Sequence, residues 1–498
     1  MRSLHGSLLA FVLTLTLAHA QTAPPVAATA APDAQAAPGA PNAPGAPGAP
    51  GAVGAARRPA QSQPTYPVPP ALTGPVTFNC GAAKKGTTAL TASSVASETA
   101  AGWDLKTAPT VEKGSCTSGK PFYFSIPVPE GNYRITVAFG GPVDSVNYVR
   151  AEVRRLQLEK ISVKAKGSVT KSFDVNVRVA EFKNPDGTPN KVRLKPREYG
   201  IPNWDNKLSL ELNGTSPSFH SITITPLVGA MAEPVVYLAG DSTMVDQDGT
   251  TWSGWGQPLP RFFLPGVVIA NNAESGESST SFQGEQRFPK IMSVIKPGDY
   301  FIMQFAHNDQ TLNPRTNQPA VPIDRYKQVM TEFVNQVRAK GAIPVIVTAQ
   351  ERRTFDANGH ITNSLGDYPQ ASRDVAAATN TALIDLTAMS TTMFEAMGPD
   401  TALLAFHAPD TTHFSNYGGY ELARCVVLGI IQDKLPLARF VDPAFVKFDP
   451  AKFDPYTSFY LPMSPEPPRG EGSMAPPINA APMPATGAQP APQPKPQP

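Results

Sequence analysis

The sequence predicts a doubly wound α/β domain preceded by an antiparallel β-sandwich domain. Before residue 229, short apolar runs with β-branched residues alternate at a period of two, which is typical of antiparallel strands. After residue 233, apolar runs alternate with helical patterns as far as about residue 435, as in parallel strands joined by helices. Alanine, proline and glycine dominate both ends of the chain, and such segments cannot bury a core.

Residues 71–228 are expected to form the sandwich. The period-two spacing gives each strand one apolar face. Turn dipeptides, among them Glu130-Gly131 and Asp186-Gly187, separate the runs. Strands are predicted at 121–129, 132–140, 172–180, 207–214 and 220–227.

Residues 229–463 are expected to form the α/β domain. Continuous apolar runs predict parallel strands that are buried on both faces. These strands are predicted at 235–240, 266–273, 299–306, 342–350 and 382–386, and the clearest helical patterns cover 325–340 and 416–435.

The two ends of the chain predict export and extended segments. Residues 1–20 have a basic start, an apolar run from Leu8 to Ala18 and a small-residue cleavage site, which predicts a signal peptide. This run is too short to span a bilayer, and no later stretch approaches that length, so we expect no membrane span. Residues 21–70 are predicted to be a disordered linker and 464–498 a proline-rich disordered tail. We expect a secreted or periplasmic protein.

The charge balance constrains the partners. Lys and Arg number 42 against 40 Asp and Glu, for a net charge of +2. Nucleic-acid-binding domains usually carry a marked basic excess, so we expect no nucleic-acid partner. Neutral and acidic polysaccharides both remain compatible with this balance.

Three cysteines are present. Cys80 and Cys116 fall in the same predicted domain, and in an exported protein they can form a disulfide. Cys425 lies in an apolar helical stretch and is expected to be a buried core residue. No cysteine or histidine spacing suggests a metal site, and we expect neither a metal nor an organic cofactor.

Chemically suggestive residues follow the predicted parallel strands. Ser242 follows the first strand, Gly276 the second and Asn308 the third, while Asp410 and His413 precede the last helix. Ligands bind beyond the carboxyl ends of such strands. A serine hydroxyl needs a neighbouring imidazole to take its proton, and the imidazole needs a carboxylate to orient it. The sequence therefore predicts Ser242, His413 and Asp410 as a catalytic triad.

An oxyanion formed at the serine also needs hydrogen-bond donors. We predict the backbone N–H groups of Ser242 and Gly276 and the side chain of Asn308 for this role. No Gly-x-Ser-x-Gly elbow surrounds Ser242, which argues against an ordinary α/β-hydrolase.

Each of these features has a simpler alternative. Gly240-Asp241-Ser242 alone is typical of a turn, and Asp241 is interpreted as organising that turn. Asp410 and His413 could instead cap the following helix. His307 and His407 are interpreted as structural residues of their loops.

Other polar and aromatic residues are possible sugar contacts. Arg154, Arg155 and Arg197 could read carboxylates on a uronate chain, but a solvated strand face is favoured for them. Trp103 and Trp204 each precede an aspartate, and core packing is favoured for both. Trp255 is expected to pack near the site.

Separated motifs carry a resemblance to a known family. They read "YLAGDSTM", "GWGQ", "NNAESGESS", "FAHND" and "DTTHFS", in that order, over about 233–435. This pattern resembles the SGNH (GDSL-type) hydrolases and, more narrowly, the rhamnogalacturonan acetylesterases. The resemblance implies a flavodoxin-like three-layer α/β/α fold and the roles given above for Ser242, Gly276, Asn308, Asp410 and His413.

Two further points bear on this resemblance. The third block usually begins with glycine, whereas this chain has Ala306, which lacks the freedom of glycine at positive φ.

Residues 71–228 resemble, less sharply, the galactose-binding-like sandwich that precedes some bacterial members. We expect this domain to pack on the esterase and to shape one wall of its cleft.

The sequence therefore predicts a secreted carbohydrate esterase. It would remove O-acetyl groups from a plant cell-wall polysaccharide, pectic rhamnogalacturonan first and xylan second, and act as a monomer. A lipolytic GDSL esterase is the alternative enzyme, but residues 243–285 are too polar to suggest an acyl pocket. A non-catalytic carbohydrate-binding protein is the alternative from another class.

Overall fold

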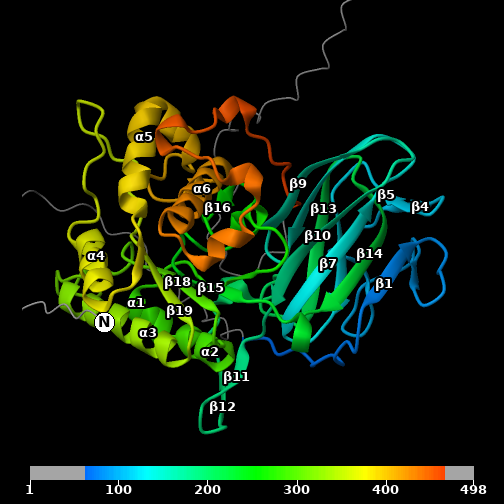
Figure 1. Ribbon diagram of the computed structural model, residues 1–498, viewed down its shortest axis with the longest axis horizontal. Helices are drawn as coiled ribbons and strands as arrows, with labels where there is room; N and C mark the ends of the chain where they lie inside the picture. Colours follow the sequence, from blue (N-terminus) through cyan, green and yellow to red (C-terminus); the bar gives the residue numbers. More distant parts are fainter. Residues whose placement is uncertain (1–61, 466–498) are drawn as a thin grey trace, which may run out of the picture. The chain divides into compact units, whose positions relative to one another are not determined.

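The computed structural model describes residues 62–465 (Figure 1). The predicted signal peptide, residues 21–61 of the predicted linker and residues 466–498 of the predicted tail lie outside the described residues. None of the helices within 62–465 is long and apolar enough to cross a membrane. Below, residues 62–228 are called the N-terminal region and 229–465 the C-terminal region.

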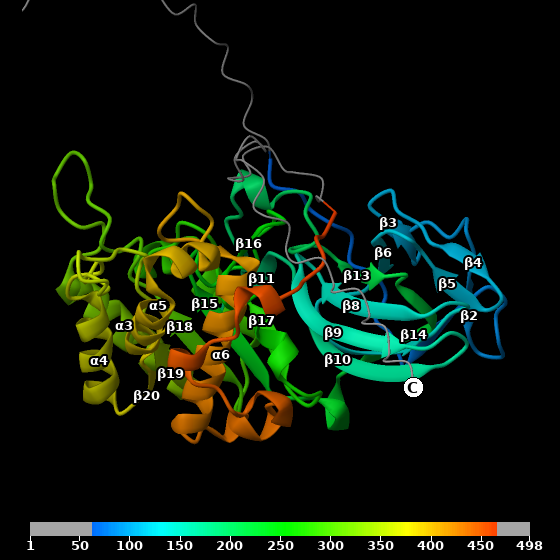
Figure 2. The ribbon, with the colours of Figure 1, turned by 90° about the horizontal axis from the view of Figure 1, so that it is seen from above.

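The N-terminal region contains two large sheets whose strand pairs are antiparallel, apart from the parallel pair β1–β2. The first comprises β1 (Val76–Cys80), β2 (Thr88–Leu90), β4 (Thr110–Glu112), β5 (Ser115–Thr117), β7 (Gly131–Phe139), β10 (Val169–Val177) and β14 (Ser218–Pro226). The second has the order β3 (Gly102–Asp104), β6 (Phe122–Pro127), β13 (Lys207–Thr215), β8 (Ser145–Ala151) and β9 (Arg155–Val163). Figure 2 shows β13, β8 and β9 side by side.

The predicted strands of this region correspond to β6, β7, β10, β13 and β14. Asp186 and Gly187 form the turn of a separate hairpin of β11 (Glu181–Lys183) and β12 (Pro189–Lys191). The strands of three residues were not predicted, because three residues are too few to display a period. The sequence prediction also missed β1, β8 and β9, although they are five, seven and nine residues long.

One hydrophobic core joins the two sheets. Ile135 and Val137 of β7 are fully buried and belong to the same cluster as Phe122 and Phe124 of β6. Alternate residues of β7 are buried, as expected for a strand with one apolar face. Trp103 is part of this core, in agreement with the packing role favoured for it.

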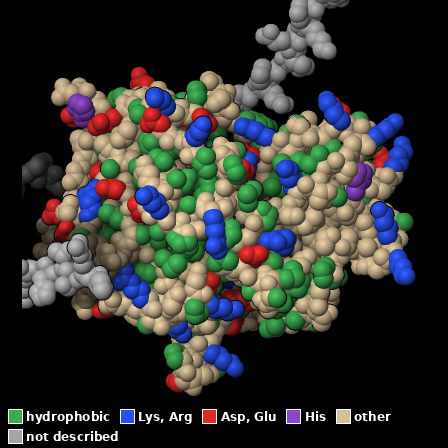
Figure 3. All heavy atoms as spheres, in the orientation of Figure 1, with side chains coloured by type: hydrophobic (Ala, Val, Ile, Leu, Met, Phe, Trp, Pro, Cys, Tyr) green, Lys and Arg blue, Asp and Glu red, His purple; other side chains and the backbone are tan. Residues whose placement is uncertain are grey.

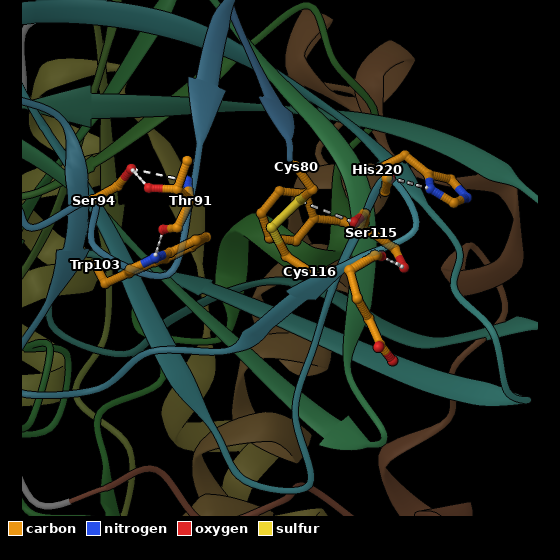
Figure 4. The surroundings of a disulfide bond; sticks show 10 residues. Cys80, Thr91, Ser94, Trp103, Ser115, Cys116 and His220 are labelled. Atoms are coloured by element: carbon orange, nitrogen blue, oxygen red, sulfur yellow. Dashed lines mark hydrogen bonds between the residues drawn. A yellow bond between two sulfur atoms is a disulfide. The ribbon is translucent and has the colours of Figure 1, made fainter. Parts of the chain in front are cut away.

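A disulfide connects β1 to β5 through Cys80 and Cys116, with Cα atoms 5.5 Å apart (Figure 4). Nearby, Trp103 donates from its indole Nε1 to the carbonyl of Thr91 at 2.8 Å. The third cysteine, Cys425, is fully buried in the C-terminal region, as predicted.

The C-terminal region contains a parallel sheet between two layers of helices. The strand order is β17 (Val268–Asn271), β15 (Val235–Gly240), β18 (Tyr300–Gln304), β19 (Ile343–Val347) and β20 (Ala382–Ile384). One layer holds α1 (Ser279–Gly284), α2 (Arg287–Val294), α3 (Ile323–Ala339) and α4 (Tyr368–Thr379), and the other α5 (Leu386–Ala402) and α6 (Asn416–Gln432). Figure 1 shows α5 and α6 on one side of the sheet and α2 and α3 on the other.

Successive side chains of each strand point alternately toward the two helical layers. In β15, Val236 and Leu238 pack with α5 and α6, whereas Val235 and Tyr237 pack with α1 to α4. A strand buried on both faces has no polar alternation, which explains the continuous apolar runs in the sequence.

Buried contacts join the N-terminal and C-terminal regions. The turn between β8 and β9 carries Glu152 and Arg154, both at positive φ (54° and 56°), and both side chains are buried. Near the end of the described chain, Arg150 donates to the carbonyl of Pro462 at 2.7 Å and Asn213 to that of Met463 at 2.9 Å.

The first described residues contact later residues of the N-terminal region. The side chain of Gln63 donates to the carbonyl of Val192 at 3.1 Å, and Asn206 donates to that of Pro67 at 2.7 Å. Gln63 and Pro67 belong to the segment predicted as a linker. The alanine and proline content of that segment could not indicate these contacts.

Charged side chains are mixed on the surface. On the face shown in Figure 3, Lys and Arg side chains are dispersed among other residues and do not gather in one patch. This distribution agrees with the small net charge of +2.

Candidate active site

Ser242 lies in a turn that begins directly after β15. The carboxylate of Asp241 accepts hydrogen bonds from the backbone N–H (2.9 Å) and the hydroxyl (2.7 Å) of Thr243. Gln304, the last residue of β18, donates to the same hydroxyl at 2.8 Å. Burial raises the pKa of Asp241. Asp241 therefore organises the turn, as interpreted from the sequence.

The structure brings Ser242, His413 and Asp410 together. His413 Nε2 lies 2.8 Å from Ser242 Oγ, and His413 Nδ1 lies 2.7 Å from Asp410 Oδ2. The other carboxylate oxygen of Asp410 accepts from the backbone N–H groups of Thr412 (2.6 Å) and His413 (3.0 Å). This chain of hydrogen bonds is suited to activating a serine hydroxyl.

Asp410 stays ionised in this setting. Partial burial by itself raises the pKa of Asp410, but the hydrogen bonds from His413 and Thr412 outweigh it and lower that pKa to about 2. Helix capping, the simpler role considered for this residue, falls instead to Ser415, whose hydroxyl accepts from the N–H of Gly418.

Trp252 and His407 support the loop that carries His413. The rings of Trp252 and His407 stack with centroids 4.0 Å apart, and Trp252 lies 5.5 Å from the His413 ring. The short strands β16 (Trp252–Ser253) and β21 (Phe414–Ser415) pair with each other. His407 donates its backbone N–H to the carbonyl of His413 at 2.9 Å, so it acts as the structural loop residue that we expected.

Gly276 lies in the loop after β17 and has a φ of 79°. The backbone N–H of Glu274 donates to the carbonyl of Gly240 at 3.1 Å, which places this loop beside the end of β15. Within residues 62–465, no intramolecular hydrogen bond engages the backbone N–H of Ser242 or Gly276. Both groups are therefore free to donate to an oxyanion.

Asn308 lies in the loop after β18. Its Nδ2 donates to the carbonyl of Glu277 at 3.0 Å, which holds the side chain beside the Gly276 loop and leaves a second N–H on the same nitrogen. The neighbouring His307 is buried and lies 2.9 Å from Gln350 Nε2. Burial holds the pKa of His307 well below its usual range, which fits the structural role predicted for it.

Ala306 adopts the conformation that glycine would adopt more easily. Its φ is 150°, a positive value that is unfavourable for a residue with a Cβ atom. The substitution seen in the sequence is therefore accommodated with backbone strain, and Asn308 still reaches the Gly276 loop.

The arginines contradict the prediction of a solvated strand face. Arg154 and Arg155 are buried, and Arg197 is mostly buried. Arg154 donates to the carbonyls of Thr250 (2.8 Å) and Trp252 (2.9 Å), and Arg155 pairs with Asp246 at 2.9 Å. The sequence could not reveal this, because their partners lie about a hundred positions further along the chain.

A pocket of about 100 Å³ adjoins the triad, and both regions line it. The N-terminal region contributes Arg197, Glu198, Ile201 and Asn203, which we call the N-terminal wall together with Arg154 and Lys195 behind it. The C-terminal region contributes Val245 to Gly249, Trp252, Glu274, Ser275, Asp410 and His413.

Sequence reasoning missed most of this pocket. Arg197 was considered as a sugar contact but assigned to a solvated face, and Trp252 was not singled out. Trp103 and Trp204 are both buried, and Trp255 packs near the site and donates to Gln304 at 2.8 Å. A charged Lys-Pro-Arg-Glu run (195–198) outside the predicted strands is the signal that could have pointed to the wall.

Known proteins resemble the region that contains this site. Residues 238–420 match the GDSL-like Lipase/Acylhydrolase family. "Rhamnogalacturonan acetylesterase RhgT" of Bacillus subtilis (strain 168) is 39% identical over 223 residues, which cover 42% of this chain and 94% of the relative. "Probable rhamnogalacturonan acetylesterase YesY" of the same organism is 35% identical over 211 residues, which cover 41% of this chain and 96% of the relative.

Among solved structures, that of protein YxiM from Bacillus subtilis shares 24% identity and covers 73% of this chain and 99% of that chain, with a TM-score of 0.42. The family match falls on the segment that carries Ser242, Gly276, Asn308, Asp410 and His413. The chain belongs to the GDSL-like lipase/acylhydrolase family and is a serine hydrolase that acts on ester bonds.

Proposed function

We propose that this chain is a secreted carbohydrate esterase that removes O-acetyl groups from a polysaccharide. Pectic rhamnogalacturonan is the first candidate substrate and xylan the second. The observation that carries the proposal is the hydrogen-bonded series Ser242–His413–Asp410 beside a pocket. The names of RhgT and YesY support the choice of rhamnogalacturonan.

The proposed reaction has two halves. Ser242 Oγ attacks the acetyl carbonyl carbon, and His413 Nε2 takes the hydroxyl proton. The tetrahedral oxyanion collapses, the bond to the sugar oxygen breaks, and His413 returns the proton to that oxygen, so that a free sugar hydroxyl leaves. Water then attacks the acetyl-serine with His413 again as base, and acetate and free Ser242 result.

Asp410 and the oxyanion donors act in both halves. The ionised Asp410 holds His413 with Nε2 toward Ser242 and stabilises the imidazolium. The N–H groups of Ser242 and Gly276 and the side chain of Asn308 would donate to the oxyanion.

The lining of the pocket supports a sugar ester over a lipid ester. Arg197, Asn203, Gln247 and Glu274 are among its lining residues, and they suit hydroxyl groups better than a long acyl chain. The pocket therefore gives no support to a lipolytic esterase.

The domain organisation proposed here follows the sequence boundaries. We infer that the two sheets within 71–228 form a galactose-binding-like β-sandwich, supported by their shared core. The sandwich would pack on the 229–463 hydrolase domain and shape one wall of its cleft, which the lining residues Arg197 and Asn203 support. A signal peptide at 1–20, export and a monomeric state complete this proposal.

Acetate release from acetylated polysaccharides tests the function. We expect release from acetylated rhamnogalacturonan to exceed release from acetylated xylan, and none from either polymer after chemical deacetylation. A protein that binds these polymers but releases no acetate would support the non-catalytic alternative and contradict the proposal.

A further inference from the structure

Two cations of the N-terminal wall hold one peptide group of the Gly276 loop. Lys195 Nζ donates to the carbonyl of Ser275 at 2.7 Å, and Arg197 Nη2 donates to the same oxygen. Lys195 also pairs with Glu277, and Arg197 with Glu274. The carbonyl of Ser275 is therefore fixed by two charged donors that belong to a different region of the chain.

The segment that carries these cations is itself anchored. Lys195 and Arg197 flank Pro196 in η1 (Pro196–Glu198), and Glu198 accepts from the backbone N–H of Lys195 at 2.8 Å. Glu198 forms a buried ion pair with Arg287 of α2 at 2.6 Å. Because both partners are buried, the position of the two cations is set by the fold.

The peptide group held by the two cations joins the carbonyl of Ser275 to the N–H of Gly276. The peptide unit is planar and trans, so the carbonyl of Ser275 and the N–H of Gly276 point in opposite directions. Donors that hold the carbonyl on one side therefore direct the Gly276 N–H to the other. The positive φ of Gly276 (79°) belongs to the same fixed conformation.

We propose that Lys195 and Arg197 are positioning residues that orient the Gly276 N–H as an oxyanion donor. The proposal rests on the proposed role of Gly276 in the oxyanion hole. The two cations also polarise the Ser275–Gly276 amide, which strengthens its N–H as a donor. Through this contact, the N-terminal region takes part in catalysis on every ester, including esters too small to reach the wall.

Single and double Lys195→Met and Arg197→Met variants test the proposal on a small soluble acetyl ester. Methionine keeps the length of the side chain and removes the donors. Loss of one oxyanion donor typically costs about 100-fold or more in kcat, and a misdirected donor should cost less. We expect kcat to fall about 10-fold in each single variant and about 100-fold in the double variant, with KM within about threefold of wild type.

Matched controls lie on the same segment. Lys191 and Arg193 are exposed, whereas Lys195 and Arg197 are partly buried. Lys191→Met and Arg193→Met should keep the wild-type kcat. Lys195→Arg keeps a cationic donor and should restore most of the kcat lost in Lys195→Met.

A second readout separates orientation of the oxyanion donor from loosening of the fold. An alkyl boronic acid forms a tetrahedral adduct with an active serine, and its inhibition constant should rise in proportion to the loss of kcat/KM. Thermal unfolding identifies the folded variants, and if the double variant does not fold, the two single variants carry the test.

The outcomes distinguish this proposal from the proposed function. A folded double variant with kcat within twofold of wild type overturns the positioning role, as does a loss of kcat without weaker boronate binding. In both cases an inactive Ser242→Ala variant would leave the esterase assignment standing. An active Ser242→Ala variant would refute the esterase mechanism itself.

Discussion

The catalytic edge and the N-terminal wall are built in opposite ways. At the catalytic edge, Ser242, Gly276 and Asn308 follow β15, β17 and β18, and a turn or loop of a few residues places each of them. At the wall, Arg154 reaches the carbonyl of Thr250 across 96 positions, and Arg197 reaches that of Ser275 across 78. The comparison indicates that the reacting groups are encoded locally, whereas the loops around them are held by long-range contacts of buried cations.

The largest effect is expected at the catalytic edge. Asp410→Asn keeps the shape of the side chain but removes the charge and favours the wrong tautomer of His413, so turnover should fall about 10²- to 10⁴-fold. Initial rates of acetate release at neutral pH measure this loss. Asp400→Asn, on α5, is the matched control and should leave the rate unchanged. An unchanged rate in Asp410→Asn would assign the orienting role to another carboxylate.

A smaller effect is expected at the wall. Arg154→Met removes the side-chain donor to the carbonyl of Trp252 and one of two donors to that of Thr250, which also accepts from Asn416. An unsatisfied buried group costs about 1–3 kcal/mol. We expect the free energy of unfolding to drop by about 1–3 kcal/mol. We expect kcat/KM to fall about 10-fold, or ~1.4 kcal/mol, because the Trp252 loop supports His413.

Urea unfolding and steady-state kinetics measure the two effects of Arg154→Met. Arg193→Met, on an exposed side chain of the same region, is the control. An Arg154→Met variant as stable and as active as wild type would mean that the wall does not hold the Trp252 loop.

Backbone strain at the catalytic edge should be measurable as a difference between two variants. Ala306 and Ala349 are both buried, but only Ala306 has a positive φ (150°). Mutation to glycine removes the same methyl group at both sites and relieves strain only at Ala306. The free energy of unfolding of Ala306→Gly should exceed that of Ala349→Gly by about 1–2 kcal/mol. Equal values would show that Ala306 is not strained.

Acid should weaken the contribution of Asp410 to stability. Its pKa is lowered to about 2 in the fold against about 4 when unfolded, so its ionised form stabilises the fold above about pH 4. This contribution is lost as the pH falls toward about 2. Because the side chain is partly exposed, we expect a contribution on the order of 1 kcal/mol.

Urea unfolding of wild type and Asp410→Asn as a function of pH measures the contribution of ionised Asp410 to stability. The difference in free energy of unfolding between them should be largest above about pH 5 and shrink toward about pH 2. A difference that is constant over this range would show that Asp410 stabilises the fold independently of its ionisation.

The sequence predicted that Ser242, Asp410 and His413 lie together, as they do in the structure, because its signals are local. A buried strand followed by Gly-Asp-Ser, and Asp and His three positions apart, identify Ser242, Asp410 and His413 without knowledge of the fold. Several strands and helices were predicted for the same reason, since β7, β15 and α6 each show their pattern within one window. The sequence prediction missed β8, β9, α4 and α5.

The wall could not be predicted in the same way. Arg154 and Arg155 are adjacent charged residues for which the sequence favours a solvated face, yet the structure buries them against a loop of the C-terminal region. Short strands such as β3 and β5 are defined by their partners and have too few residues for a pattern. Only the tertiary structure reveals which distant carbonyls a buried arginine satisfies.

Labelling with a fluorophosphonate tests most directly the claim that Ser242 is the nucleophile. Such a probe forms a stable bond only with a serine activated by its neighbours. We expect one label per chain on the peptide that contains Ser242, loss of acetate release in proportion to labelling, and no label on Ser242→Ala. Labelling at another residue, or full acetate release by a chain labelled at Ser242, would contradict the account.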